Sequence, residues 1–247
     1  MNARASRLWC VALVAIFATA ASLAAQDVVV QKDGQRREGE ILGVADGKLR
    51  IKVGPAETSI QMDQVASVSK APPKTYEEAL RVWQDGNANK TLSILKPLVD
   101  TFRGLPTEWT ERASALLGDV YLSLDQFPAA EAAFAEFTKS YPNATSLSDI
   151  GLARLAVSKK DFAGAKTRLA PIVAEAEKVV AAGGGRGATY GQAFFLMGIV
   201  HENEGAYPLA LRDYLSAVTL FYDDEAVVAK ARERAELLVK EKQVIVP

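Results

Sequence analysis

The spacing of apolar residues changes once along the chain. Between residues 27 and 70 apolar side chains alternate with polar ones, as at Leu49, Ile51 and Val53, and beyond residue 76 they recur every three or four positions. Alternation is the period of a β-strand with one buried face, and the longer spacing is that of an amphipathic helix. The chain is therefore expected to carry a small β domain followed by a helical region.

The β domain, residues 26–70, is expected to contain short strands joined by tight turns such as Asp46-Gly47. The predicted strands are Asp27–Gln31, Glu38–Val44, Lys48–Val53, Glu57–Met62 and Val65–Ser69. Short strands at this density indicate a small curled antiparallel barrel. The opening hairpin resembles that of SH3-like and Sm-like barrels in the pattern of Val28, Val30, Asp33, Gly34, Gly39 and Ile41.

Prolines separate the β domain from the helical region. The stretch Ala71-Pro72-Pro73-Lys74 is predicted to be a stiff linker, and residues 71–75 mark the domain boundary. The helical region, residues 76–224, is expected to begin with the helices Tyr76–Asp85 and Ala88–Phe102. These two helices form a first, degenerate hairpin.

The stretch Glu111–Ala144 contains the clearest helical hairpin. Apolar residues recur at helical spacing on both sides of a turn at Asp125-Gln126, and Pro142 ends the second helix. This stretch resembles a tetratricopeptide repeat (TPR), a unit of about 34 residues. The residues that match the family in order and spacing are Leu117, Gly118, Tyr121, Phe127, Ala130, Phe134 and Pro142. Phe137 departs from the family, which usually has a small residue there.

The third unit, Ser146–Val180, repeats the pattern 35 residues later. Asp161 is a predicted N-cap for its second helix. That helix is expected to run to about Ala182, with a kink near Leu169 caused by Pro171. The matching residues are Leu152, Ala153, Ala156, Phe162, Ala165 and Leu169.

The fourth unit, Gly191–Asp224, restores the full pattern, with His201 in the place of Tyr121. Ahead of it, the run Gly183–Gly187 is expected to be a flexible connector before a helix that starts near Ala188. The alternative for this run is an anion-binding nest. The matching residues of the fourth unit are Phe194, Met197, Gly198, Tyr207, Ala210, Tyr214 and Ala217.

The resemblance implies a mainly α fold, a TPR-like α-solenoid of helical hairpins preceded by a small antiparallel β-barrel. A charged amphipathic helix, Glu225–Lys242, is expected to cap the array, so that residues 225–247 form the cap and tail.

Residues 1–25 have the features of a secretory signal peptide. Arg4 and Arg7 precede an apolar run, and Ser22 and Ala24 supply the small residues of a cleavage site. The alternative is an uncleaved membrane anchor, because Leu8–Ala25 is just long enough to cross a bilayer. The sequence therefore predicts an exported bacterial protein of the periplasm or cell envelope.

The charge balance argues against a nucleic-acid partner. The chain holds 29 basic and 30 acidic residues, a net charge of −1, and without Arg4 and Arg7 of the signal segment the balance is 27 against 30, or −3. Nucleic acid and anionic membranes attract a basic face, so membrane contact is expected only through an uncleaved signal segment. We interpret the basic residues of the first strands as solvated strand faces; they are Lys32, Arg36, Arg37, Lys48, Arg50 and Lys52.

The residues that metal and nucleophilic chemistry require are nearly absent. His201 is the only histidine, and Cys10, in the signal segment, is the only cysteine. A Cys/His zinc site and a thiol–histidine pair are thereby excluded, and a triad that uses His201 alone is the remaining alternative. Carboxylate pairs such as Glu77-Glu78 and Asp223-Asp224 are expected on helix surfaces and at caps. We predict neither an enzyme nor a cofactor.

The resemblance also implies a concave groove, lined by the first helix of each hairpin, in which the family binds its ligands. The positions carried over are Arg112, Ala115, Asp119, Leu122, Ser123, Leu147, Ile150, Arg154, Val157, Ser158, Gln192, Phe195, Ile199, Glu202 and Asn203. This mixture of apolar and charged residues suits an extended peptide or a partner helix. The alternative for several of them is packing against neighbouring helices.

These features predict a non-enzymatic scaffold of the cell envelope that binds a protein or peptide partner in the groove. The alternative is a structural or assembly subunit of an envelope complex, or a protein that self-associates. The degenerate first hairpin favours this alternative, because Trp83 is expected to be too apolar to remain exposed.

Overall fold

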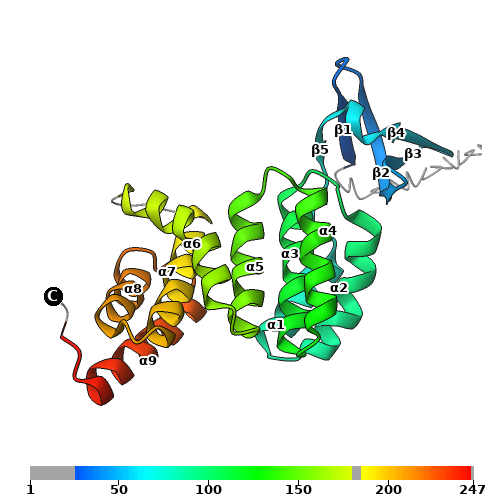
Figure 1. Cartoon of the computed structure of the whole chain (residues 1–247). Helices are drawn as coiled ribbons and strands as arrows, with labels where there is room; N and C mark the ends of the chain where they lie inside the picture. The colour runs from blue at the N-terminus through cyan, green and yellow to red at the C-terminus, as the bar shows by residue number, and fades with distance from the viewer. Residues whose placement is uncertain (1–25, 180–184, 246–247) are drawn as a thin grey trace, which may run out of the picture.

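The structure, a computed structural model, describes residues 26–179 and 185–245. A small antiparallel sheet lies at one end of a row of helical hairpins, and the last helix lies at the other end (Figure 1). This arrangement confirms the predicted fold class of helical hairpins after a small antiparallel β domain. The predicted signal peptide lies outside the described residues, and no described helix has the length and apolar character needed to span a bilayer.

The sheet has the strand order β4-β3-β2-β1-β5, with every neighbouring pair antiparallel. Its core contains Val29, Leu49 and Ile51, all wholly buried, because alternate residues of each strand face inward. The strands, which lie close to the predicted ones, are β1 Asp27–Gln31, β2 Arg36–Ala45, β3 Lys48–Val53, β4 Ala56–Gln61 and β5 Val65–Ser69. A 3-10 turn, Met62–Gln64, joins β4 to β5.

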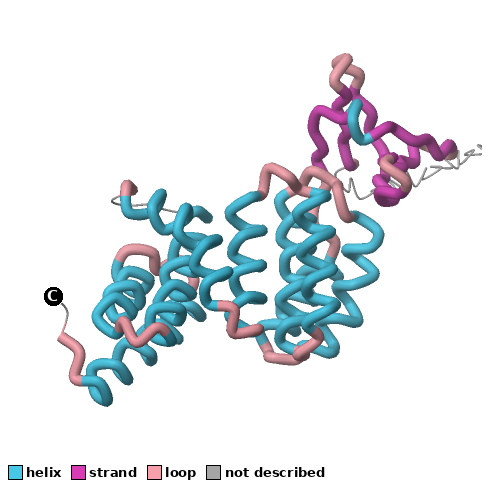
Figure 2. Tube along the Cα trace, in the orientation of Figure 1, coloured by secondary structure: helices cyan, strands magenta, loops and turns pink. Residues whose placement is uncertain are grey.

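The helices pair as consecutive antiparallel hairpins, α1 with α2, α3 with α4, α5 with α6 and α7 with α8, and α9 follows as a cap (Figure 2). Their bounds are α1 Lys74–Gln84, α2 Ala88–Phe102, α3 Glu108–Ser123, α4 Phe127–Ser140, α5 Thr145–Ser158, α6 Phe162–Glu177, α7 Gly185–Asn203, α8 Tyr207–Thr219 and α9 Glu225–Lys242. The predicted bounds of α2 and α9 are confirmed.

Two predicted helix ends between α6 and α7 are wrong. Helix α6 was expected to reach about Ala182 but ends at Glu177, where the backbone N–H of Lys178 turns back to the carbonyl of Glu175. Helix α7 begins at Gly185, inside the glycine run that was expected to be a connector. Glycine is a poor helix former, so tertiary packing of α7 against α6 and α8 overrides local propensity here.

Small residues allow the helices to approach closely, as the repeat pattern predicts. A Cβ atom placed on Gly118 of α3 would lie 2.4 Å from Cε1 of Phe134, and one placed on Gly151 of α5 would lie 2.3 Å from the same atom. The ring of Phe134, on α4, is therefore held between two glycines. Gly198 of α7 stands in the same relation to Tyr214 of α8, at 2.5 Å.

Side chains join the sheet to the first hairpins. Leu105, in the loop between α2 and α3, is wholly buried in the core of the sheet. The indole Nε1 of Trp109 donates a hydrogen bond to the carbonyl of Lys70 (3.0 Å), and the Lys70 ammonium pairs with Asp27 (2.7 Å) with both side chains only 13% exposed. A Cβ at Gly43 of β2 would lie 2.5 Å from the carbonyl oxygen of Thr101. The sheet is thus packed against α2 and α3.

Candidate functional site

A groove of about 600 Å³ runs along the first helices of the hairpins, from α1 to the start of α9. The side chains of Leu122, Val157 and Phe195 give it apolar walls. The sequence-predicted residues that line it are Asp119, Leu122, Ser123, Arg154, Val157, Ser158, Gln192 and Phe195. The structure therefore brings together residues from α3, α5 and α7 that lie one repeat apart.

The other predicted residues of α3 and α5 lie elsewhere. Ile150 is wholly buried in the core of the array, so its side chain has no access to a ligand in the groove. Arg112 is exposed, pairs with Glu108 (2.6 Å) and faces a recess between the sheet and α1. Ala115 and Leu147 pack with Phe137 and Tyr141.

The last three predicted positions serve the α7–α8 hairpin. Ile199 packs against the core, and the side-chain amide of Asn203 donates to the carbonyl of Ile199 (2.8 Å). The carboxylate of Glu202 accepts a hydrogen bond from the Tyr214 hydroxyl (2.7 Å) and lies 3.3 Å from the guanidinium of Arg234 on α9. Burial and this carboxylate raise the pKa of Tyr214. Packing and intramolecular bonds account for these positions.

Four polar side chains cross the groove in sequence, and we call them the polar ladder. One guanidinium nitrogen of Arg154 pairs with Asp119, and the other donates to the Gln192 side-chain oxygen (2.8 Å). The Gln192 amide donates to Asp224 (2.9 Å), whose other oxygen accepts the backbone N–H of Val227 (3.2 Å) and so caps α9. The ladder connects α3, α5, α7 and α9.

One end of the ladder has an acceptor that no described residue satisfies. Oδ1 of Asp119 is buried and has no hydrogen-bond partner in the described part of the chain, although the side chain as a whole is 20% exposed. A buried acceptor without a donor costs about 1–3 kcal/mol. Because Arg154 already neutralises the charge of this carboxylate, a neutral N–H or O–H donor suits Oδ1.

The sequence interpretation missed the ends of the groove. Trp83 of α1 is half-buried and lines one end, and Asp224 and Lys230 line the other. The sequence predicts a helix-surface or capping role for Asp224, which caps α9 and also belongs to the ladder. Helix α9 takes the position of the first helix of a further repeat. A step of one repeat length, about 34 residues, from Gln192 leads to the first turn of α9.

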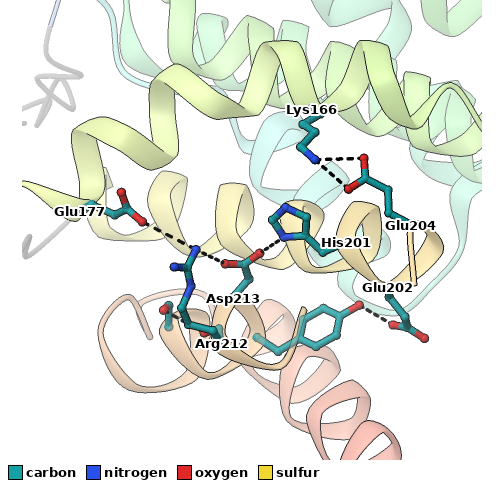
Figure 3. A network of polar contacts seen from close by, with 9 residues as sticks. Lys166, Glu177, His201, Glu202, Glu204, Arg212 and Asp213 are labelled. Carbon is teal, nitrogen blue, oxygen red and sulfur yellow. Dashed lines mark hydrogen bonds and ion pairs between the residues drawn. The ribbon is translucent and has the colours of Figure 1, made fainter. Parts of the chain in front are cut away.

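A second polar network lies inside the α7–α8 hairpin (Figure 3). His201 Nδ1 is 2.6 Å from a carboxylate oxygen of Asp213, which is wholly buried, and Arg212 of α8 lies 3.4 Å from the other oxygen. Burial raises the pKa of Asp213 against the opposing effects of His201 and Arg212. Since His201 is itself only 8% exposed, this pair joins two helices and faces no groove.

Metal-binding side chains do not gather in the part of the chain that the structure describes. Residues 26–179 and 185–245 hold no group of three or more His, Cys, Asp or Glu side chains placed to bind an ion. The polar ladder contains two acids, one base and one amide. Asp119 and Arg154 form an ion pair, and Asp224 accepts hydrogen bonds from the Gln192 amide and the Val227 N–H.

Comparison with known proteins gave matches among solved structures alone. No protein-family model matches the sequence, and no curated protein matches it. The chain is similar to MamA 41-end from Desulfovibrio magneticus RS-1, with 16% identity, a TM-score of 0.44, and coverage of 69% of this chain and 85% of that one. It is also similar to the ArsTM double mutant of MamA RS-1, with 15% identity, a TM-score of 0.41, and coverage of 70% and 98%.

Proposed function

We propose that the protein is a non-enzymatic interaction scaffold whose concave groove binds an extended peptide or a helix of a protein partner. The observation that carries this proposal is the polar ladder beside the apolar side chains of Leu122, Val157 and Phe195. Together these residues offer both hydrogen bonds and apolar contact along one surface.

The shape of the groove favours a polypeptide over a small molecule. It is open and extends over side chains from α1, α3, α5, α7 and α9, whereas small-molecule sites bury most of their ligand. An extended peptide or a helix presents side chains at regular intervals along such a surface. Alternating apolar and polar contacts can then fix the register of the bound segment.

The electrostatics of the groove favour a partner that is not strongly charged. Asp119 and Arg154 neutralise each other, and Asp224 and Lys230, which both line the far end of the groove, carry opposite charges. A polypeptide backbone is uncharged and carries N–H donors and C=O acceptors, which suit the exposed polar atoms of such a groove. A nucleic acid needs several cations to neutralise its phosphates, which this groove does not supply.

The predicted signal peptide supports a place for this scaffold in the periplasm or cell envelope. The small β domain, which we infer to be SH3-like or Sm-like from the opening hairpin, would then be held at one end of the groove-bearing array. Its packing against α2 and α3 supports a fixed orientation.

A pull-down from envelope extract with tagged residues 26–247 tests the groove. The variant Arg154→Ala/Phe195→Ala removes one ladder member and one apolar wall, and it is expected to lose the captured partner. Arg168→Ala is the matched control, because Arg168 is an exposed arginine of α6 that pairs with Asp149 (3.3 Å) outside the groove. Thermal denaturation verifies that the variants fold. Undiminished capture by the folded groove variant would overturn the proposal.

A second candidate function is that of a self-associating assembly subunit. Trp83, which first favoured this alternative, lines the groove. Apolar side chains are nevertheless exposed at the other end of the array, among them Leu220 at 52% and Val239 at 51%. Light scattering on residues 26–247 tests this candidate, and a monomer at high concentration would remove it.

A further inference from the structure

The last helix of the array is covered on one side only. Each of α1, α3, α5 and α7 packs against a second helix of its own hairpin, and α9 packs against α8 and α7 in the manner of a first helix. Among the described residues no helix follows α9 to cover its outer side. One flank of α8 and one face of α9 therefore remain unpartnered.

An apolar recess of about 510 Å³ lies between these two surfaces. Leu211, Leu215 and Val218 of α8 line it, together with Ala235 and Val239 of α9. Val239 is half-exposed, although a capping helix normally turns a polar face outward. Apolar surface of this kind, rimmed by charge, is typical of an interaction site.

The rim of the recess carries charges of alternating sign. Arg232, Glu236 and Lys240 follow one another at intervals of four on α9, and all three are exposed. None of them forms an ion pair within the described residues, whereas Lys96 and Asp100 at the same spacing on α2 do, at 2.5 Å. These three charges are therefore available to an incoming surface.

We propose that the recess is the interface with a second copy of this chain, related by a two-fold axis that crosses α9 near residue 238. In such an isologous interface each contact occurs twice. Two antiparallel α9 helices would place Glu236 opposite Lys240 of the partner subunit, and the reverse pair follows by symmetry. Val239 would lie near the axis, so that each copy covers the other's apolar recess.

The alternating charges on the rim of the recess favour a second copy of the chain over other partners. A uniformly acidic or basic helix would meet a like charge on this rim, but an antiparallel copy of α9 meets the opposite charge at both positions. The proposal rests on the second candidate function and is independent of the groove. Lys230, which lines the groove, and Val239 are nine residues apart, so they lie on opposite sides of α9, and a dimer leaves the groove open.

Sedimentation velocity on residues 26–247, from low to high micromolar concentration, tests the interface by charge reversal. Glu236→Lys and Lys240→Glu each place like charges opposite one another twice, and each is expected to weaken the dimer about tenfold or more. The double variant Glu236→Lys/Lys240→Glu restores opposite charges and is expected to recover the original dissociation constant. Glu241→Lys, which changes the same charge on another face of α9, is the control and should dimerise normally.

The outcomes separate this interface from the two candidate functions. A monomer at every concentration would overturn both self-association and the interface. A dimer that Glu236→Lys and Lys240→Glu leave unchanged would overturn the interface alone. The groove variant Arg154→Ala/Phe195→Ala is expected to dimerise like the parent, because its substitutions lie outside the recess.

Discussion

The substitution Gly118→Ala tests whether α3 has room for one more methyl group where it packs against α4. The Cβ of an alanine there would lie 2.4 Å from Cε1 of Phe134, far inside van der Waals contact. Phe134 is 1% exposed, and Gly151 blocks its retreat from the opposite side, where an added Cβ would lie 2.3 Å from the same atom. Gly118→Ala is therefore expected to destabilise the fold.

The magnitude follows from two opposing effects. Replacing glycine by alanine within a helix stabilises it by about 1 kcal/mol, and overpacking a core costs about 1–3 kcal/mol. Because the Phe134 ring is confined on both sides, the cost lies near the upper limit, and we expect a net loss of about 2 kcal/mol in the free energy of unfolding. For a chain of this size the melting temperature should fall by about 4–8 °C.

Urea denaturation of residues 26–247, followed by circular dichroism, measures this loss. Ala132→Gly on the exposed face of α4 is the control for helix propensity alone. Gly151→Ala should cost a similar amount, and the double variant should cost less than the sum, because the first methyl already displaces the shared ring. If Gly118→Ala equalled or exceeded the parent in stability, the close approach of α3 and Phe134 would be refuted.

Two further predictions concern the α7–α8 hairpin and the attachment of the sheet. Burial raises the pKa of Asp213, so the folded protein binds this proton more tightly than the unfolded chain. The resulting stabilisation is full below about pH 4 and is lost as the pH rises through the raised pKa. Urea denaturation at a series of pH values measures this loss, and Asp213→Asn should reduce it. An unchanged dependence of the free energy of unfolding on pH in this variant would contradict the prediction. Trp109→Phe removes the hydrogen bond to the Lys70 carbonyl, at a cost of about 1 kcal/mol in the free energy of unfolding. This variant should be cleaved faster beside residue 70 in limited proteolysis, and an unaltered cleavage rate would contradict the prediction.

Turn and cap residues explain why many boundaries could be predicted from the sequence. Helices α2, α6 and α9 begin directly after Asn87, Asp161 and Asp224, whose side chains accept the backbone N–H three residues on, at 3.1, 2.9 and 3.2 Å. The hairpin between β2 and β3 turns at Asp46-Gly47, where both residues have positive φ. Local chemistry alone specifies such positions.

The interval between α6 and α7 could not be predicted in this way. Apolar periodicity continues beyond Glu177, so the sequence pattern does not mark where α6 ends. Glycines 185 and 187 disfavour a helix, yet α7 includes both. Its position depends on packing by side chains such as Tyr190 and Phe194 against the rest of the array, which is a property of the assembled hairpins.

The groove shows the same division between local and tertiary information. Helical spacing placed Ile150 and Arg154 on one face of α5, one turn apart. The first is wholly buried, and the second reaches Asp119 of α3 and Gln192 of α7. Depth and pairing depend on the separation between helices of different repeats, which periodicity within a single helix does not encode.

The attachment of the sheet makes the molecule stiff where a two-domain chain usually bends. Leu105 belongs to the core of the sheet although it lies between two helices, and the Lys70–Asp27 pair and the Trp109 hydrogen bond bridge the same junction. A torque applied to the sheet is therefore transmitted to α2 and α3 by these packed side chains as well as by the backbone of residues 70–73. A segment held in the groove would consequently be presented at a set angle to whatever the sheet contacts.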